Sequence, residues 1–328
     1  MISRRNVSKL FLLGGLSALA LPSFADDSGS KIKTLRITIL STQLADRDYL
    51  AEWGFAALVE VDGRRFLFDS GAHPDFVLKN AKAMKLDLSD IDEMVLSHNH
   101  NDHSGGIIAL RSHFMKINPK ALSVTHAGIG IFGRRIDRQG RDDNGTLPIR
   151  AAYEKLGGKW VQHVKPAELA PGVWMTGPVP RPNNEHNWSG YRQMIDERTG
   201  LPGPEDNVPE DSALIFDTPK GLVILTGCGH AGIVNIAQYA RNIVRPAPIE
   251  ALVGGLHLFN ASDETIAWTA DQLKAMEVHN LLGGHCTGIE ATYKLRAALG
   301  LDRKTATVAA VGSVYDLADG LHPGDMAG

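Results

Sequence analysis

Short segments of alternating apolar and polar residues open the body of the chain, which is the pattern of half-buried β-strands. Leu35 to Leu40 is the first of them, and residues 57–61 and 65–69 follow. Asp62-Gly63 between the last two favours a tight hairpin turn. A segment of helical spacing and a short apolar strand come next, at residues 75–84 and 93–97.

The second half of the chain repeats this order. Residues 213–217 and 222–226 flank the turn Pro219-Lys220-Gly221 and predict a second hairpin. Helical and strand-like segments then alternate, the helices near 233–242, 263–276 and 289–299 and the strands near 250–254, 279–282 and 306–310. Two β-rich segments, each followed by strand–helix alternation, predict an α/β fold of two similar halves, packed sheet against sheet with helices outside.

One long segment interrupts the pattern. Residues 178–211 are rich in Pro, Asn, Gly and acidic residues and show little periodicity. Loops of this length inside a domain are usually functional or disordered. We expect this segment to form a lid over the site described below. No linker separates the two halves, so residues 26–328 are expected to form a single domain.

The N-terminus has the pattern of an export signal. Arg4-Arg5 precedes an apolar stretch, Leu10 to Leu21, and Ser23-Phe24-Ala25 places small residues where a signal peptidase cleaves. The paired arginines resemble a twin-arginine signal, although Val7-Ser8 departs from its usual Phe-Leu. An ordinary secretory signal is the alternative. We therefore expect residues 1–25 to engage the export machinery and the mature protein to be periplasmic or secreted.

Composition excludes some classes of protein. The net charge is −3 and no long basic run occurs, which argues against general nucleic-acid binding. The body of the chain has no apolar run long enough for stable membrane insertion. Cys228 and Cys286 are the two cysteines of the chain. A chain of this size does not need a disulfide for stability, and each cysteine has a histidine close by in the sequence.

A dense group of metal-ligating residues follows the strand at 93–97. His98, His100, Asp102 and His103 fall within six residues. In a turn between a strand and a helix expected near Ser104, His98 and His100 are expected to face one metal, and Asp102 and His103 a second. Imidazole and carboxylate suit one or two divalent transition-metal ions, Zn²⁺ first and Mn²⁺ or Fe as alternatives.

The spacing His98-x-His100-x-Asp102-His103 after a strand resembles the signature of the metallo-β-lactamase superfamily. Phe68-Asp69-Ser70-Gly71 resembles that family's Asp-x-Gly turn. Further segments resemble a subgroup that includes dihydropteroate-synthase-like proteins of methanopterin biosynthesis, namely Thr176 to Arg181, Gly227 to Asn235, Gly254 to Leu258 and Gly284 to Gly288. The resemblance implies an αβ/βα sandwich with the metal site along one edge of the paired sheets.

The resemblance also implies ligands later in the chain. His230 and His285 occupy ligand positions, while Cys228 stands where the superfamily places a metal-bridging aspartate. Cys228 is either a thiolate ligand or a residue that shapes the turn, and Cys286 is expected to be a packed small residue. His257 is a ligand, a proton donor or a hydrogen-bonded core histidine.

Other residues are expected to support the metals or the substrate. The carboxylate of Asp69 is expected to accept the free ring N–H of a ligand histidine. Arg181 and His186, in the long segment, and Trp53 are predicted contacts of a small-molecule substrate. Trp53 stands where the subgroup tends to have histidine, which weakens any direct transfer of the pterin-related substrate.

These residues together predict metal-assisted hydrolysis. A metal-bound hydroxide would attack an ester, lactone, thioester or phosphoester. Asp102 would orient the hydroxide, and His257 would protonate the leaving group if it is not a ligand. Two alternatives remain open: a synthase-like condensation of a pterin, and a non-catalytic metal-binding or sensing module.

Overall fold

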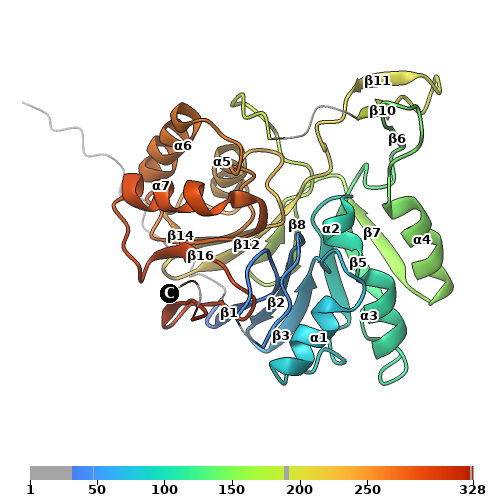
Figure 1. Cartoon of the computed structure of the whole chain (residues 1–328), viewed down its shortest axis with the longest axis horizontal. Coiled ribbons are helices and arrows are strands. Elements are labelled where there is room, and N and C mark those ends of the chain that lie inside the picture. The colour runs from blue at the N-terminus through green and yellow to red at the C-terminus, as the bar shows by residue number, and fades with distance from the viewer. Residues whose placement is uncertain (1–31, 47, 188–191, 326, 328) are drawn as a thin grey trace, which may run out of the picture.

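A computed structural model describes residues 32–46, 48–187, 192–325 and 327. The predicted signal segment, residues 1–25, lies outside these residues. Two sheets with helices on their outer faces make up the body of the molecule (Figure 1). The predicted αβ/βα sandwich is therefore confirmed. No helix within the described part of the chain is long and apolar enough to cross a membrane.

The first sheet has eight strands in the order β18-β17-β1-β2-β3-β4-β5-β7. Its antiparallel half contains the first predicted hairpin, and its parallel half runs from β3 to β7. The strands are β1 (Leu35–Ser41), β2 (Ala56–Val61), β3 (Arg64–Phe68), β4 (Glu93–Leu96), β5 (Val124–Gly128), β7 (Lys159–His163), β17 (Val314–Asp316) and β18 (Gly320–His322).

The second sheet has seven strands in the order β16-β15-β14-β13-β12-β9-β8. Its predicted hairpin pairs antiparallel, and the strands from β13 to β16 are parallel. The strands are β8 (Ala167–Ala170), β9 (Val173–Met175), β12 (Ala213–Thr218), β13 (Gly221–Thr226), β14 (Ile249–Gly254), β15 (Asn280–Gly283) and β16 (Ala306–Val308). Strands β12 to β15 are buried throughout because both faces of this sheet are covered.

Helices cover the outer face of each sheet (Figure 1). Leu110 and Tyr153 come from the helices that pack on the first sheet, and Ile236 and Leu273 from those that pack on the second. A third apolar cluster, which includes Ile37 and Phe216, lies between the sheets. The helices are α1 (Phe76–Ala83), α2 (Asn101–Ser104), α3 (Ile107–Phe114), α4 (Thr146–Lys155), α5 (Ile233–Ile243), α6 (Asp263–Ala275), α7 (Ile289–Leu299) and the 3₁₀ turn η1 (His285–Thr287).

Two local expectations need correction. The segment 178–211 is not wholly irregular, because β10 (Gln193–Ile195) and β11 (Pro202–Glu205) pair with each other, and β10 pairs with β6 (Arg135–Ile136). Such short strands carry too few residues for a visible alternation. The helix expected near Ser104 begins at Asn101, so Asp102 and His103 lie inside its single turn.

Candidate metal centre

The chemically active side chains follow the carboxyl ends of neighbouring strands in both sheets. Asp69 follows β3, and the group from His98 to His103 follows β4. Cys228 and His230 follow β13, His257 follows β14, and His285 follows β15. These strands run parallel within each sheet, so their carboxyl ends meet at one edge. The topology brings residues almost 220 positions apart in the sequence into one site.

His98, His100 and His230 form the first ligand group, with one ring nitrogen of each lying within 4.8 Å of the others. The Nδ1 atom of His98 lies 2.9 Å from Ser97 Oγ, and Nδ1 of His230 lies 2.5 Å from the carbonyl oxygen of Asn187. Within the described structure, Nε2 of His98 and of His230 is buried with no hydrogen-bond partner. Buried polar atoms are normally paired, so these nitrogens fit a metal ion.

Burial keeps this first group neutral. It lowers the pKa of His98 and of His230 well below the usual value, and the neighbouring histidines add to the effect. Burial also lowers the pKa of His100, to about 3. Neutral imidazole is the form that binds a metal, so the three rings have the required protonation state at neutral pH.

Asp102, His103 and His285 form the second ligand group. The Nε2 atom of His285 lies 3.3 Å from Asp102 Oδ2 and 3.2 Å from His103 Nε2. Burial opposes ionisation of Asp102, but His103 and His285 outweigh it and hold its pKa well below the usual value. Burial likewise opposes protonation of His103, but the carboxylates of Asp69 and Asp102 raise its pKa above the usual value. The second group therefore combines one carboxylate with two histidines, and a metal ion would have to displace any proton on Nε2 of His103.

Asp69 supports both groups without joining either. Its Oδ2 lies 2.7 Å from His103 Nδ1 and accepts a hydrogen bond of 2.8 Å from Ser97 Oγ, and its Oδ1 accepts one of 2.7 Å from the Ser97 N–H. Ser97 Oγ in turn contacts His98. One buried carboxylate thus orients a histidine of each group, directly or through Ser97.

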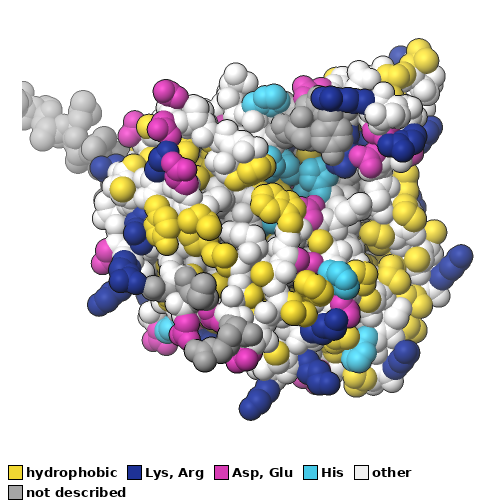
Figure 2. Space-filling model, in the orientation of Figure 1, with side chains coloured by type: hydrophobic (Ala, Val, Ile, Leu, Met, Phe, Trp, Pro, Cys, Tyr) yellow, Lys and Arg dark blue, Asp and Glu magenta, His cyan; other side chains and the backbone are white. Residues whose placement is uncertain are grey.

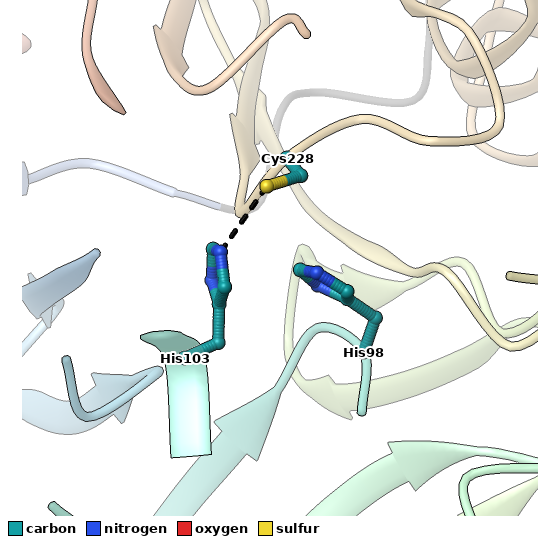
Figure 3. A group of neighbouring side chains, drawn as sticks. All are labelled: His98, His103 and Cys228. Atoms are coloured by element: carbon teal, nitrogen blue, oxygen red, sulfur yellow. Dashed lines mark hydrogen bonds between the residues drawn. The ribbon is translucent and has the colours of Figure 1, made fainter. Parts of the chain in front are cut away.

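Cys228 lies beside the two groups. Its Sγ is 3.2 Å from His103 Nε2, and it lies within 4.8 Å of a ring nitrogen of His98 (Figure 3). The thiol is buried. Cys286 is close to Cys228 and His285, but its Sγ donates to the carbonyl oxygen of Cys228 at 3.5 Å. Both cysteines are unpaired thiols.

A cavity of about 1190 Å³ opens above the ligand groups. His100, Asp102, Cys228, His230 and His285 contribute to its lining. In Figure 2 histidine side chains gather near the middle of the face, with hydrophobic side chains beside them. The cavity is large enough for a small organic molecule, and its metal-ligating residues lie together.

Comparison with known proteins identifies the family. The sequence matches the profile of the metallo-beta-lactamase superfamily over residues 54–236, more than half of the chain. The chain belongs to the metallo-β-lactamase superfamily. The fold of that superfamily binds divalent metals, typically zinc, and the two ligand groups are candidate sites for them.

Two curated relatives, both from Methanocaldococcus jannaschii, match this metallo-β-lactamase chain over most of its length. A 7,8-dihydropterin-6-methyl-4-(beta-D-ribofuranosyl)-aminobenzene-5'-phosphate synthase is 31% identical, over 80% of this chain and 90% of the relative. An uncharacterized protein is 28% identical, over 79% of this chain and 93% of the relative. The resemblance to the methanopterin subgroup is thereby confirmed.

Solved structures show the same metallo-β-lactamase fold. Tm1679, described as a metal-dependent hydrolase of the beta-lactamase superfamily, has a TM-score of 0.68 and 24% identity, and the match covers 85% of this chain and 98% of that one. Zn²⁺-bound PqqB from Methylobacterium extorquens has a TM-score of 0.52 and 14% identity, with coverages of 86% and 100%.

The predicted substrate contacts of this metallo-β-lactamase domain differ in their placement. Trp53, His186 and His257 line the cavity. Arg181 is not among the described residues that line it, and its Nη2 donates to the carbonyl oxygen of Val208 at 2.8 Å. The clamp on a substrate anion stays a prediction.

His257 sits in the cavity wall with a strained backbone. Its φ is 50°, in the left-handed region that costs a non-glycine residue about 1 kcal/mol or more. Burial lowers its pKa to about 4, so its ring is neutral at pH 7. His257 belongs to neither ligand group, which favours a hydrogen-bonding role over metal ligation.

A buried charged network behind the first ligand group was missed in the sequence. Arg135 lies 2.9 Å from Asp206 and 2.5 Å from Glu210, and Glu210 accepts from the backbone N–H of Asn99, between the two histidines His98 and His100. Asp211 accepts a hydrogen bond of 2.8 Å from the N–H of Ala231, next to His230. The only signal was a run of acidic residues directly before an apolar strand.

Proposed function

We propose that this protein is a metal-dependent hydrolase of small carbonyl or phosphoryl esters. The observation that carries the proposal is the pair of ligand groups at the floor of the cavity, with unpartnered ring nitrogens on His98 and His230. Divalent ions there, Zn²⁺ first, would supply water acidic enough to ionise near neutral pH and would polarise the substrate oxygen. Esters, lactones, thioesters and phosphoesters are the substrate classes that such a site suits.

The residues of the chain supply the remaining functions. Asp102 provides the negative charge of the second group and lines the cavity, so its carboxylate can orient an incoming water. His257 lines the same cavity with a neutral ring that holds one N–H. That N–H is suited to donate a hydrogen bond to the departing oxygen, whereas full protonation of the ring at pH 7 is opposed by burial.

The aromatic wall of the cavity favours a substrate with a flat or apolar group. Trp53, Phe259 and Trp268 line it and are 52%, 43% and 37% exposed. The rings of Trp53 and Phe259 meet edge to face, with their centroids 5.5 Å apart. The ring centroids of Trp53 and His285 are 4.9 Å apart. A substrate ring stacked on Trp53 would therefore have its scissile group close to the second ligand group.

A synthase-like condensation is the second candidate, because the name of one relative describes it. The proposed export, and Trp53 at a position where the subgroup tends to have histidine, favour the hydrolase over a pterin condensation. A non-catalytic metal-binding module is a third candidate, which a turnover assay separates from the first two.

The test combines metal analysis with a substrate panel. Mature protein is expected to hold divalent metal and to hydrolyse at least one aryl ester, thioester, lactone or phosphoester. Asp102→Ala is expected to reduce metal at the second group more than at the first and to remove turnover. Protein with its full metal content and no hydrolysis of any panel member, but turnover with a pterin donor, would favour the synthase.

Export by the twin-arginine route is part of the same proposal. It rests on Arg4-Arg5 and the apolar stretch that follows. This route carries folded proteins, so metal can be loaded before export. Replacing Arg4-Arg5 by Lys-Lys is expected to keep the protein in the cytoplasm, measured by cell fractionation. Unchanged export of that variant would point to the general secretory route.

A further inference from the structure

The two ligand groups meet at one thiol. Cys228 Sγ is 3.2 Å from Nε2 of His103, which belongs to the second group. The same sulfur lies within 4.8 Å of a ring nitrogen of His98, from the first group. Figure 3 shows the side chains of His98 and His103 extending toward Cys228 from below. Within the described structure, no other residue shares a ligand cluster with both of these histidines.

The backbone before Cys228 fixes this position. A Cβ atom on Gly227 would lie 2.1 Å from Ser97 Oγ and 2.7 Å from Asp69 Oδ2, which no side chain can occupy. The end of β13 is therefore pressed against the residues that orient His98 and His103. Ser97 and Asp69 thus contact both the two histidines and the backbone that carries Cys228. The same two residues therefore fix the position of the thiol relative to His98 and His103.

We propose that Cys228 is a metal ligand shared by the two groups, with its thiolate between the ion held by His98, His100 and His230 and the ion held by Asp102, His103 and His285. Ligation would replace the S–H bond by one bond from the thiolate sulfur to each ion and release the proton to solvent. This inference rests on the metal centre of the proposed hydrolase but not on its substrate.

A sulfur ligand changes which metals the centre prefers. Thiolate is a soft ligand that favours Zn²⁺ or Co²⁺ over Mn²⁺, whereas a carboxylate accommodates all three. The first group contains nitrogen ligands alone, and the second contains one carboxylate. The shared thiolate therefore makes both positions selective for the softer ions.

Cys286 offers a matched control a short distance away. It is a buried thiol like Cys228 and clusters with Cys228 and His285. Its Sγ donates to the backbone oxygen of Cys228 and shares no cluster with His98 or His103. Cys286 is therefore placed to support the turn, and in Cys286→Ser the hydroxyl can still donate to the same carbonyl oxygen, so the shared position is expected to stay intact.

The test uses Co²⁺, whose bonds to thiolate give intense near-ultraviolet charge-transfer absorption. Metal-free full-length protein, and the variants Cys228→Ser, Cys228→Asp and Cys286→Ser, are titrated with Co²⁺ alone. Wild type and Cys286→Ser are expected to develop the absorption band. Cys228→Ser is expected to lose the band and to bind metal at least about ten-fold more weakly. Cys228→Asp is expected to lose the band but to regain metal binding, which separates lost ligation from misfolding.

The outcomes separate this inference from the proposed function. Wild type that binds cobalt without the band, or a band that survives in Cys228→Ser and disappears in Cys286→Ser, overturns the thiolate ligand while leaving the hydrolase proposal standing. A full band in protein that hydrolyses no ester supports the ligand and counts against the hydrolase. Wild type that binds no cobalt overturns both.

Discussion

The carboxylate of Asp69 lies 2.7 Å from Nδ1 of His103, and both side chains are fully buried. This contact leaves Nε2 of His103 to face Asp102, His285 and Cys228. The φ of Asp69 is 55°, so the chain adopts a strained turn to make the contact. Asp69, which belongs to neither ligand group, thus decides which ring nitrogen of His103 faces the second group.

Asp69→Asn is therefore expected to weaken metal binding at the second group by about 10- to 100-fold. The amide cannot accept the three hydrogen bonds that Asp69 accepts, so the ring of His103 loses its fixed orientation. Competition with a chelator measures the affinity. Asp62→Asn is the control, since Asp62 also accepts backbone hydrogen bonds but lies in the β2–β3 turn. Equal affinity in wild type and Asp69→Asn would show that the contact does not orient the ligand.

The fold was largely predictable because its elements carry strong local patterns. The two hairpins and the helices α5 to α7 lie within a few residues of their predicted positions. The parallel strands β13 to β15 place His230, His257 and His285 at one edge. From the sequence, His230 and His285 were ligands only as the resemblance implied, and the role of His257 stayed open. Residues whose partners are distant and whose segments lack periodicity could not be assigned this way.

Arg181 and Arg135 illustrate that limit. Arg181 lies within the segment 178–211, and Arg135 lies outside the segments for which the sequence predicts an element, so neither sequence context indicates a partner. Arg135 is fully buried between Asp206 and Glu210, while Arg181 donates to the backbone of Val208. Only the path of residues 206–211 decides which arginine pairs with which acid, and that path is set by packing rather than by local pattern.

Removing His100 is expected to change how the stability of metal-free protein depends on pH. Burial lowers the pKa of His100 to about 3, so the folded state leaves it neutral while the unfolded chain protonates near pH 6.5. Its contribution is therefore fully present above pH 6.5 and is lost as the pH falls toward 3. The slope is at most about 1.4 kcal/mol per pH unit.

The comparison uses denaturant unfolding of chelator-treated wild type and His100→Gln at pH 7.5 and pH 5. The wild type is expected to lose more unfolding free energy between these values than the variant, by about 1–2 kcal/mol. His113→Gln, at an exposed position on α3, should follow the wild type. Identical losses in wild type and His100→Gln would mean that His100 titrates normally in the fold.

Trp53→Ala is expected to raise KM for aryl esters by roughly three- to ten-fold while leaving metal content unchanged. The ring of Trp53 forms part of the cavity wall above His285, and its loss removes a stacking surface without removing a ligand. Alkyl esters should be affected less. Tyr293→Ala is the control, because Tyr293 is an exposed aromatic residue on α7 outside the cavity lining. A similar rise in KM for alkyl and aryl esters would contradict a stacking role.

The segment 178–211 was predicted to be a lid that sets substrate choice, and its residues divide into two parts in the structure. Residues 182–187 line the cavity, whereas no residue of β10 or β11 is among the described residues that line it, and β10 pairs with both β11 and β6. Glu185 attaches the first part to α5, since its carboxylate accepts hydrogen bonds from the N–H groups of Val234 and Asn235 at 3.2 and 2.8 Å. The carbonyl oxygen of Asn187, at the end of this first part, contacts Nδ1 of His230.

Glu185→Ala is therefore expected to alter KM or substrate preference and to lower stability by about 1–3 kcal/mol, because two buried N–H groups lose their acceptor. Burial raises the pKa of Glu185 to about 7, so the neutral side chain of Glu185→Gln is a close substitute that should retain most of the wild-type behaviour. Shortening the β10–β11 turn at residues 197–200 should leave the kinetic constants unchanged. Altered kinetics in the shortened protein, together with wild-type kinetics in Glu185→Ala, would contradict this prediction. That result would show that the β10–β11 turn, rather than residues 182–187, sets substrate choice.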